Sequence, residues 1–235
     1  MAPTLDQDKP PPPKKRTAKT RSRKRRPLES VSRPKQARSE RTLERILDAA
    51  ETLILERGLK QVSIGDIVRE AGSSVGGFYA RFKDKGELLV ALSEQTQRRL
   101  AERVAALMDP GSWGDATLRE IVHVCAQEIV GHVLSRRRLQ SAILQSVAAD
   151  SSRWKHGIEF RTRLVEGVTA LMLTRREEIR HPMPERAARF AIEAALALMD
   201  QRALFGDLQE QWRLEEDTLI EEMERMVLAY LDVAP

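Results

Sequence analysis

The residues whose types and spacing best suit ligand binding lie between Val62 and Leu89, in the run VSIGDIVREAGSSVGGFYARFKDKGELL. Serine hydroxyls, a phenol and several cations follow one another there, and such groups hydrogen-bond phosphate and base edges. Ser74 can cap a helix whose first turn, Val75 to Gly77, carries almost no side-chain bulk. Small residues in an exposed first turn let the backbone approach a nucleic acid closely. The run therefore has the pattern of a DNA-reading element.

Helix-start signals define the elements that must position these residues. Ser63 and Asp66 form the N-cap pair that opens a helix before the glycine turn. Asp84 and Glu87 form another such pair, so a third helix begins at Lys85. The chain therefore predicts two short helices joined by a tight turn, followed at once by a longer helix.

Another helix is expected before this run, from about Ser39 to the residue before Gly58. Its apolar residues recur at the spacing of one buried helix face. They are Leu43, Ile46, Leu47, Ala50, Leu53 and Ile54. With this helix included, the predicted domain has the three helices that support a helix-turn-helix.

Residues 39–92 resemble the DNA-binding domain of the TetR/AcrR family of bacterial transcriptional regulators, in order and without a gap. The resemblance is carried by Ile46, Ala49, Ala50, Gly58, Ser63, Ile64, Asp66, Ile67, Ala71, Gly72, Ser74, Gly76, Phe78, Tyr79, Phe82, Lys85, Glu87 and Leu88. It implies an N-terminal three-helix helix-turn-helix domain and a C-terminal helical ligand-binding and dimerisation domain. The expected fold class is all-α, with about nine helices.

The expected DNA contacts follow from this resemblance and from side-chain chemistry. Tyr79 and Lys85 match family positions that hydrogen-bond phosphate. Arg81 is expected to project outward to phosphate or to guanine, with which arginine makes bidentate contacts. The whole expected set is Arg38, Arg41, Ser63, Ser74, Val75, Gly76, Gly77, Tyr79, Arg81, Lys83 and Lys85.

Two residues depart from the family pattern. Ser73 stands where the family usually has a small apolar residue, and Gly77 stands where threonine often contacts phosphate. The second glycine also costs about 1 kcal/mol of helix propensity. We hypothesise that the basic N-terminal segment replaces the lost contact. An unchanged salt dependence of DNA binding after its cations are neutralised would contradict this.

That segment, residues 1–38, is strongly basic and rich in proline. It holds thirteen Lys or Arg and three Asp or Glu, a net charge of +10, whereas the remaining residues carry −5. Its composition predicts a disordered arm that adds phosphate contacts, although a solvated tail that only aids solubility is the simpler alternative. The expected domains are thus the arm (1–38), a DNA-binding domain (39–92) and a regulatory and dimerisation domain (93–235).

Composition and motif searches argue against other classes of protein. No apolar run is long enough to span a bilayer, and the single Cys125 allows no intrachain disulfide, so we expect a cytoplasmic protein with no membrane partner. No catalytic or nucleotide-binding motif is present, and the four histidines lack metal-ligand spacing. We expect neither an enzyme nor a metal or other cofactor.

The regulatory domain is predicted to be helical throughout, over about residues 85–108, 115–134, 138–147, 152–176, 184–205 and 218–231. Polarisable and aromatic side chains on its helices are candidates for a ligand pocket: Cys125, His132, Trp154, Phe160 and Met172. Ordinary core packing is the alternative for each of them. The many aliphatic residues favour a small apolar effector.

The last two predicted helices suggest self-association. The resemblance implies that they form a four-helix interface with a second copy, through Phe190, Ala191, Ala194, Leu198, Leu219, Met223, Met226, Val227 and Tyr230. Their spacing is equally that of an intramolecular core. A homodimer would place two reading helices at two half-sites of double-stranded DNA.

The resemblance implies a homodimeric repressor that leaves a palindromic operator when a small molecule binds. An activator, or a regulator without a ligand, would use the same helix-turn-helix domain. A weakly specific nucleic-acid-binding protein driven by the basic arm is a further alternative, which predicts similar affinity for any sequence.

Overall fold

The computed structural model describes residues 33–105, 107–206 and 214–234, with side chains except at 33–38, 110 and 153. Residues 1–32 of the predicted arm therefore lie outside the described residues. The chain divides into two units, Met1–Arg38 and Ser39–Pro235. The description that follows concerns the second unit, in which we call residues 39–92 the head and residues 93–234 the body.

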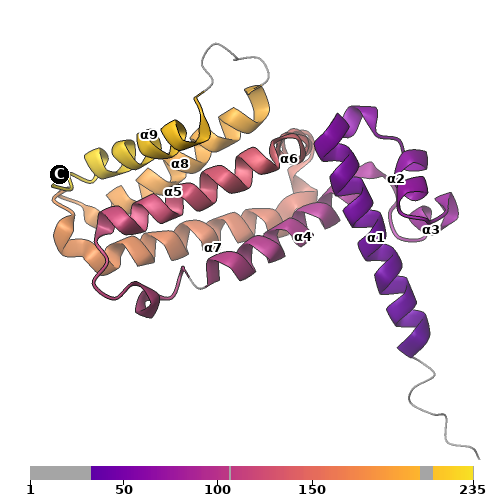
Figure 1. The fold of residues 1–235 in the computed structure, drawn as a ribbon, viewed down its shortest axis with the longest axis horizontal. Coiled ribbons are helices and arrows are strands. Elements are labelled where there is room, and N and C mark those ends of the chain that lie inside the picture. The colour runs from indigo at the N-terminus through magenta and orange to yellow at the C-terminus, as the bar shows by residue number, and fades with distance from the viewer. Residues whose placement is uncertain (1–32, 106, 207–213, 235) are drawn as a thin grey trace, which may run out of the picture. The chain divides into compact units, whose positions relative to one another are not determined.

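Every element of the described residues is helical, which confirms the all-α fold class (Figure 1). The α-helices are α1 (Arg33–Arg57), α2 (Ile64–Glu70), α3 (Val75–Tyr79), α4 (Lys85–Ala105), α5 (Leu118–Ser135), α6 (Arg137–Ala149), α7 (Lys155–Met172), α8 (Pro184–Phe205) and α9 (Glu216–Tyr230). Short 3-10 helices are η1 (Leu59–Gln61), η2 (Pro110–Trp113), η3 (Ser151–Trp154) and η4 (Leu173–Glu178).

Helix α1 begins six residues earlier than the predicted start near Ser39. Arg33 is its first residue, and Pro34 falls in its first turn. Proline suits that position because its fixed φ is helical and the N–H it lacks would have no partner there. The last part of the predicted arm is therefore helical backbone.

Local capping forms the helix-turn-helix. The Ser63 hydroxyl accepts a hydrogen bond from the Asp66 N–H at 3.1 Å, and the Asp66 carboxylate accepts one from the Ser63 N–H at 3.1 Å. Gly72, with φ of 56°, makes the turn after α2. The Ser74 hydroxyl then accepts from the Gly77 N–H at 3.0 Å, which starts α3. The capping predictions for these helices are confirmed.

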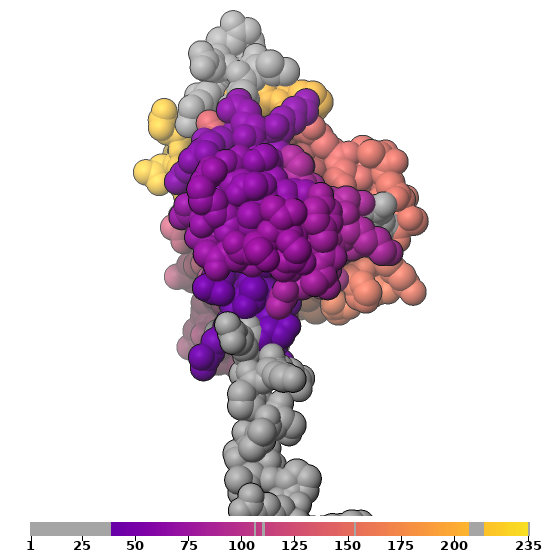
Figure 2. Space-filling view, turned by 90° about the vertical axis from the view of Figure 1, so that its right-hand side faces the viewer, coloured from indigo at the N-terminus to yellow at the C-terminus, as the bar shows by residue number. Residues whose placement is uncertain are grey.

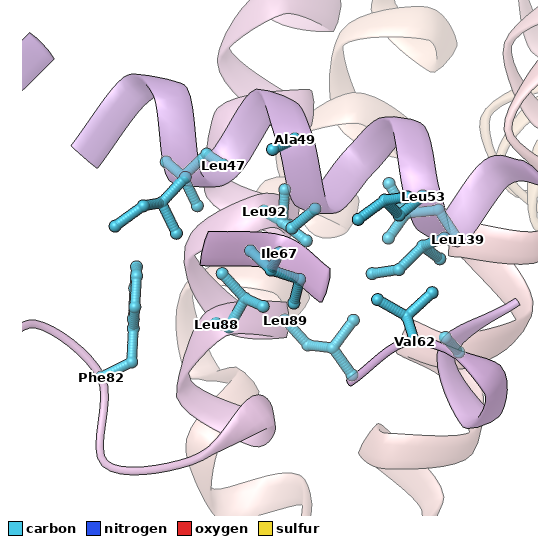
Figure 3. Packing of buried hydrophobic residues seen from close by; sticks show 14 of the residues in the cluster. Leu47, Ala49, Leu53, Val62, Ile67, Phe82, Leu88, Leu89, Leu92 and Leu139 are labelled. Carbon is cyan, nitrogen blue, oxygen red and sulfur yellow. The ribbon is translucent and has the colours of Figure 1, made fainter. Parts of the chain in front are cut away.

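The core of the head lies where α1 crosses α2, α3 and the start of α4 (Figure 3). Ile46, Ile67, Phe78 and Leu88 are completely buried in it. The same cluster takes in body residues Leu139, Ala142 and Ile143 from α6 and Trp154 from η3. The head is therefore packed onto the body by shared apolar contacts and is not joined to it by α4 alone.

The body is a bundle in which α5, α7, α8 and α9 lie side by side (Figure 1). Small residues of α8, namely Ala187, Ala188, Ala191 and Ala195, are buried where its neighbours approach closely. None of the described helices combines the length and the apolar character needed to cross a bilayer.

Candidate nucleic-acid interface and internal cavity

Helix α3 divides its side chains between the core and the surface. Val75 and Tyr79 are 50% and 55% exposed, whereas Phe78 is completely buried and Phe82 nearly so. The Tyr79 ring stands edge-on to Phe78 at 5.5 Å between centroids. Figure 2 shows the head as one continuous surface, coloured from indigo to magenta. The predicted reading helix is thus fixed by two phenylalanines and presents an apolar side chain and a phenol outward.

Arg81 is half-buried and already bonded within the head, so its contact with phosphate or guanine stays a prediction. Its guanidinium donates hydrogen bonds to the carbonyl of Gly77 at 2.8 Å and to the hydroxyl of Ser39 at 3.0 Å. A carbonyl at the end of a helix lacks an intrahelical partner, and an arginine side chain four residues later can supply one. In this structure Arg81 therefore ties the end of α3 to α1.

The two lysines after α3 differ in their surroundings. The Lys85 ammonium donates to the carbonyl of Val62 at 2.8 Å and to that of Leu59 at 3.4 Å, so it holds the loop before α2. Lys83 is 87% exposed and lies 3.5 Å from the carboxylate of Glu87. Their contacts with phosphate stay predictions, and Lys83 is the more accessible of the two.

The two departures from the family pattern face each other. A Cβ atom added at Gly77 would lie 2.9 Å from the Ser73 Oγ and 3.3 Å from the Ser74 Oγ. Real Cβ atoms essentially never approach a heavy atom within 3.0 Å. The glycine at 77 therefore leaves room for the serine at 73. Gly76, in contrast, is exposed, and a side chain there would meet no atom closer than 4.0 Å.

The remaining predicted DNA-binding residues lie at the edge of this surface. Ser63, Ser74 and Arg41 are exposed, whereas the side chain of Arg38 lies outside the described residues. The Ser63 hydroxyl is engaged in capping. Hydrogen bonds from the Ser63 hydroxyl and the Ser63 N–H, followed by that of Arg69, lower the pKa of Asp66 to about 2.

A cavity of about 230 Å³, partly open to solvent, lies in the body and is lined by residues of α4, α5, α6, α7 and α8. Three of the five predicted pocket residues line it, namely His132, Trp154 and Phe160. Leu100, Ile129, Leu144 and Leu164 supply apolar wall, and two ion pairs, Arg161–Asp200 at 2.7 Å and Arg103–Glu128 at 3.0 Å, lie close by. The cavity suits a small, mostly apolar molecule.

Cys125 and Met172 do not line this cavity. They are buried in the body core, beside a void of about 10 Å³ that is no larger than one water needs. Burial, aided by the charge of Glu128, raises the pKa of the Cys125 thiol to about 11. A thiol in this state is a poor nucleophile and packs as an apolar group.

His132 is a neutral imidazole at the cavity wall. Burial, together with the charges of the nearby Arg136 and Arg103, lowers its pKa to about 4. Its Nδ1 and the Nε1 of Trp154 are buried and have no hydrogen-bond partner among the described residues. Each of these side chains therefore has a nitrogen beside the cavity that is not yet hydrogen-bonded.

The predicted dimer residues fall into two groups. Phe190, Met226 and Tyr230 are 54%, 39% and 41% exposed, and the two aromatic rings lie 5.4 Å apart. Ala194 and Leu198 are half-buried. In contrast, Ala191, Leu219, Met223 and Val227 are buried within the chain itself, as the core alternative expects.

Glu51 is not among the residues singled out from the sequence, although it is only 8% exposed. It lies four residues after Leu47 and three before Ile54, on the buried face of α1. A carboxylate within an apolar helix stripe was the signal that could have identified it. Over the described ranges, no cluster of three or more His, Cys, Asp or Glu could hold a metal ion.

Known proteins share the sequence pattern of this helix-turn-helix. A family described as bacterial regulatory proteins, tetR family, matches residues 46–92. The HTH-type transcriptional regulator AcrR of Shigella flexneri is 30% identical over 120 residues, which cover 48% of this chain and 53% of that protein. YvdT of Bacillus subtilis, an uncharacterized HTH-type transcriptional regulator, is 47% identical over 51 residues, or 22% and 26% of the two chains. The chain thus spans about half or less of the length of these relatives.

The similarity in three dimensions extends further along the chain. A bacterial regulatory protein in the tetR family from Rhodococcus RHA1 matches with a TM-score of 0.60 at 14% identity, over 83% of this chain and 98% of that one. At this identity the likeness concerns the fold. Residues 46–92 thus match the helix-turn-helix domain of the tetR family, and the chain shares the helical fold of the tetR-family regulator to which it is similar.

Proposed function

We propose that this protein is a homodimeric transcriptional regulator that binds a palindromic operator, represses from it, and releases it when a small apolar molecule occupies the cavity. The observation that carries the proposal is the presentation of α3, whose first turn is Val75, Gly76 and Gly77. Its small residues and the exposed Tyr79 suit close approach to a DNA groove. A cytoplasmic location and the absence of a membrane partner follow from this function.

Cations around α3 support a DNA-binding surface. Arg41, Arg45 and Lys83 are exposed on the head, and Arg45 approaches the turn at Gly72. Exposed cations beside a reading helix position the protein on phosphate, whereas Val75 and the backbone of α3 contact base edges. The basic arm would add affinity and salt dependence more than sequence preference.

An aromatic patch on α8 and α9 supports a homodimer. The rings of His181 and Phe190 both contact that of Tyr230, with centroids 5.3 Å and 5.4 Å from its centroid, and Met226 is exposed on the same helix as Tyr230. Exposed aromatic residues are enriched at protein interfaces. A two-fold dimer through this patch would give two heads for two half-sites.

The cavity supports a ligand-responsive regulator over a ligand-independent one. A volume of about 230 Å³ with a mostly apolar wall accepts a small molecule, and neutral His132 adds a polar contact without a charge. Such a molecule acts on DNA binding only by favouring one arrangement of the heads over another. Repression is the response that the family resemblance favours.

The proposal is tested by selecting bound sequences from a random DNA pool, with the full chain and with residues 33–235, which keep α1 whole. An enriched palindrome with both proteins supports a sequence-reading dimer. No enrichment, together with loss of binding when residues 1–32 are removed, would instead establish binding driven by the arm. Reporter transcription from the recovered operator then separates a repressor from an activator.

The two tyrosines of the chain provide matched variants. We expect Tyr79→Phe to weaken operator binding by about threefold to tenfold, because it removes one hydrogen bond to phosphate, with no change in the dimer. Tyr230→Ala should weaken self-association in analytical ultracentrifugation and leave the head intact. The opposite assignment of the two effects would contradict the proposed surfaces.

A further inference from the structure

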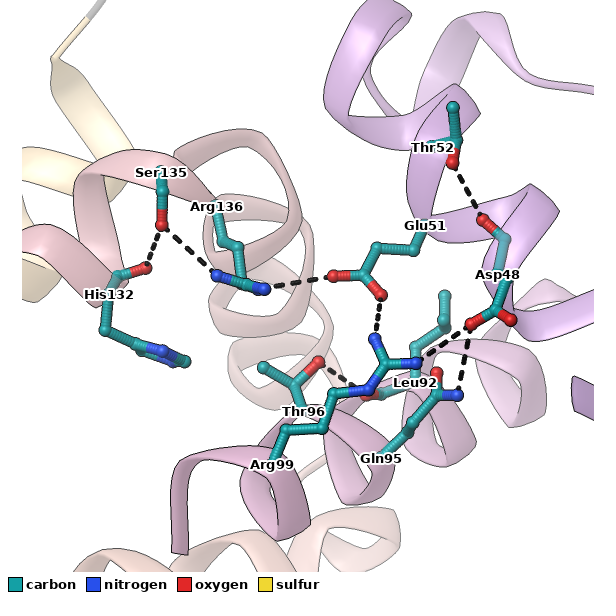
Figure 4. Close-up of polar contacts among 10 residues, drawn as sticks. All are labelled: Asp48, Glu51, Thr52, Leu92, Gln95, Thr96, Arg99, His132, Ser135 and Arg136. Carbon is teal, nitrogen blue, oxygen red and sulfur yellow. Dashed lines mark hydrogen bonds and ion pairs between the residues drawn. The ribbon is translucent and has the colours of Figure 1, made fainter. Parts of the chain in front are cut away.

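Glu51 is a buried carboxylate of the head that is bonded to two different parts of the body. One oxygen accepts a hydrogen bond from the Arg99 guanidinium on α4 at 2.9 Å. The other accepts from the Nε of Arg136, between α5 and α6, at 3.2 Å (Figure 4). Only 10% of the Glu51 side chain is exposed, whereas the side chains of Arg99 and Arg136 are 47% and 27% exposed, so the carboxylate depends on these two cations more than they depend on it.

Each arginine is held by a further contact of its own (Figure 4). Arg99 also donates to the Asp48 carboxylate of α1 at 3.0 Å. Arg136 donates to the Ser135 hydroxyl at 3.2 Å, and that hydroxyl donates to the His132 carbonyl, also at 3.2 Å. A continuous set of hydrogen bonds therefore joins α1 to the last turn of α5.

The two helices that carry these contacts also form walls of the cavity. Ser93, Thr96 and Leu100 of α4 line it, and so do His132 and Val133 of α5. Arg99 lies between Thr96 and Leu100 in the sequence, and Arg136 lies one turn beyond His132. A group that widens the cavity between α4 and α5 would therefore also separate the backbone positions that carry Arg99 and Arg136.

Glu51 cannot follow both arginines when they separate, because its two oxygens are fixed to one carboxylate. If one arginine moved away, the buried Glu51 carboxylate would keep only one of its two cationic partners, which is strongly unfavourable. The carboxylate, and α1 with it, is then displaced toward one arginine. The reading helix moves with α1 because both share the core around Ile46 and Phe78.

We propose that Glu51 is a positioning residue that makes the orientation of the head depend on the separation of α4 and α5 across the cavity. The inference rests on the proposed function, since it names the residue through which the contents of the cavity would reach the DNA-binding surface. It assigns Glu51 no contact with DNA or with a ligand.

The test uses a side chain in place of the unidentified ligand. Val133 is 7% exposed and lines the cavity, so Val133→Phe adds a larger ring at the α5 wall of the cavity. Glu51→Gln keeps the shape of the side chain and removes its charge. Operator affinity is measured for the full chain, each single variant and the double variant, which forms a double-mutant cycle.

We expect Val133→Phe to weaken operator binding by about tenfold when Glu51 is present and by less than about threefold in the Glu51→Gln chain. Glu44→Gln is the matched control, because Glu44 is an exposed carboxylate of α1 two turns earlier. Val133→Phe should keep its full effect beside Glu44→Gln. An equal effect beside Glu51→Gln overturns the proposal, and so does Val133→Phe having no effect on the otherwise unchanged chain.

Two further measurements cover the cases in which Glu51→Gln does not fold or no operator is recovered. If Glu51→Gln does not fold, Arg136→Gln replaces it, since Arg99 still compensates the carboxylate. If no operator is recovered, amide hydrogen exchange of residues 64–79 is followed in the same four chains. A change caused by Val133→Phe that disappears with Glu51→Gln supports the coupling even when the DNA proposal has failed. A change that persists, or none at all, overturns it.

Discussion

The head and the body differ in how completely their interiors are filled and their buried polar groups are hydrogen-bonded. Ile46, Ile67, Phe78 and Leu88 are completely buried in the head, and the polar side chains that begin its two short helices, Ser63, Asp66 and Ser74, are used in caps. The body surrounds a cavity of about 230 Å³. Its described residues also contain buried polar atoms without partners, on Gln95, His132, Trp154 and Thr169.

For the function that we propose, this difference corresponds to two mechanical requirements. A helix that reads base edges must be held to a fraction of an ångström, so the head tolerates little free volume. A regulatory domain that adopts two arrangements needs space and unused hydrogen-bonding capacity, because a fully packed core has one state. The contacts of Glu51 join the rigid region to the adaptable one.

The largest expected effect comes from replacing a phenylalanine by alanine, which we compare in the two regions. Phe78→Ala should lower the free energy of unfolding by about 3–5 kcal/mol, because it opens a cavity in a filled core. Phe160 already borders the cavity and is half-buried, so Phe160→Ala should lose only about 1–2 kcal/mol. Urea denaturation of both variants measures the difference. Equal losses would contradict the contrast between the two regions.

The next effect depends on pH and belongs to the body. The pKa of His132 is about 4 in the folded chain, against 6.5 as the ordinary value. Between these values the unfolded chain binds a proton and the folded chain does not. Stability should therefore fall by at most about 3 kcal/mol as pH decreases from 6.5 to 4, and this contribution should fall no further below 4.

Comparison with His132→Leu isolates this effect in thermal or urea unfolding measured across the pH range. The variant should lose the part of the acid destabilisation that lies between pH 6.5 and 4. His156→Gln is the control, because the His156 side chain is 77% exposed. A wild-type curve and a His132→Leu curve that stay parallel in this range would refute the assignment.

The sequence predicted well those features of the fold that depend on residues close to one another along the chain. Ser63, Ser74 and Asp84 cap their helices as predicted, because a capping side chain and its partner lie three residues apart. The buried stripe of α1 and the inward side of α3 were also predicted, since helix periodicity determines them.

Contacts between distant residues could not be predicted in this way. The hydrogen bond of Arg81 to Ser39 was not predicted, because Ser39 lies 42 residues earlier in the chain. The packing of Leu139 and Trp154 into the head core could not be predicted for the same reason, because these residues lie far from the head along the chain. Periodicity gives the face of a helix but not its neighbour, and so Cys125 and Met172 could not be separated from the residues that line the cavity.

A smaller effect should be equal in the two regions. Ser74 caps α3 in the head, and Thr117 caps α5 in the body by accepting from the Glu120 N–H. Replacing either residue by alanine should lower stability by about 1 kcal/mol, since the loss concerns one cap and not the surrounding packing. Asparagine at each position should restore most of it. A much larger loss at Ser74 would mean that the cap also supports the head core.

The smallest expected effect tests how little space the head has. Gly77→Ala should gain helix propensity, but its methyl group would lie 2.9 Å from the Ser73 Oγ. The two contributions oppose each other, so the single variant should change stability by less than about 0.5 kcal/mol.

In the Ser73→Ala chain the obstructing hydroxyl is absent, and Gly77→Ala should then stabilise the protein by up to about 1 kcal/mol. The four chains of this double-mutant cycle, compared by urea denaturation, measure the interaction directly. A coupling of zero would mean that the Ser73 hydroxyl simply rotates away. The head would then have the same local freedom as the body, and its rigidity would come from the apolar core alone.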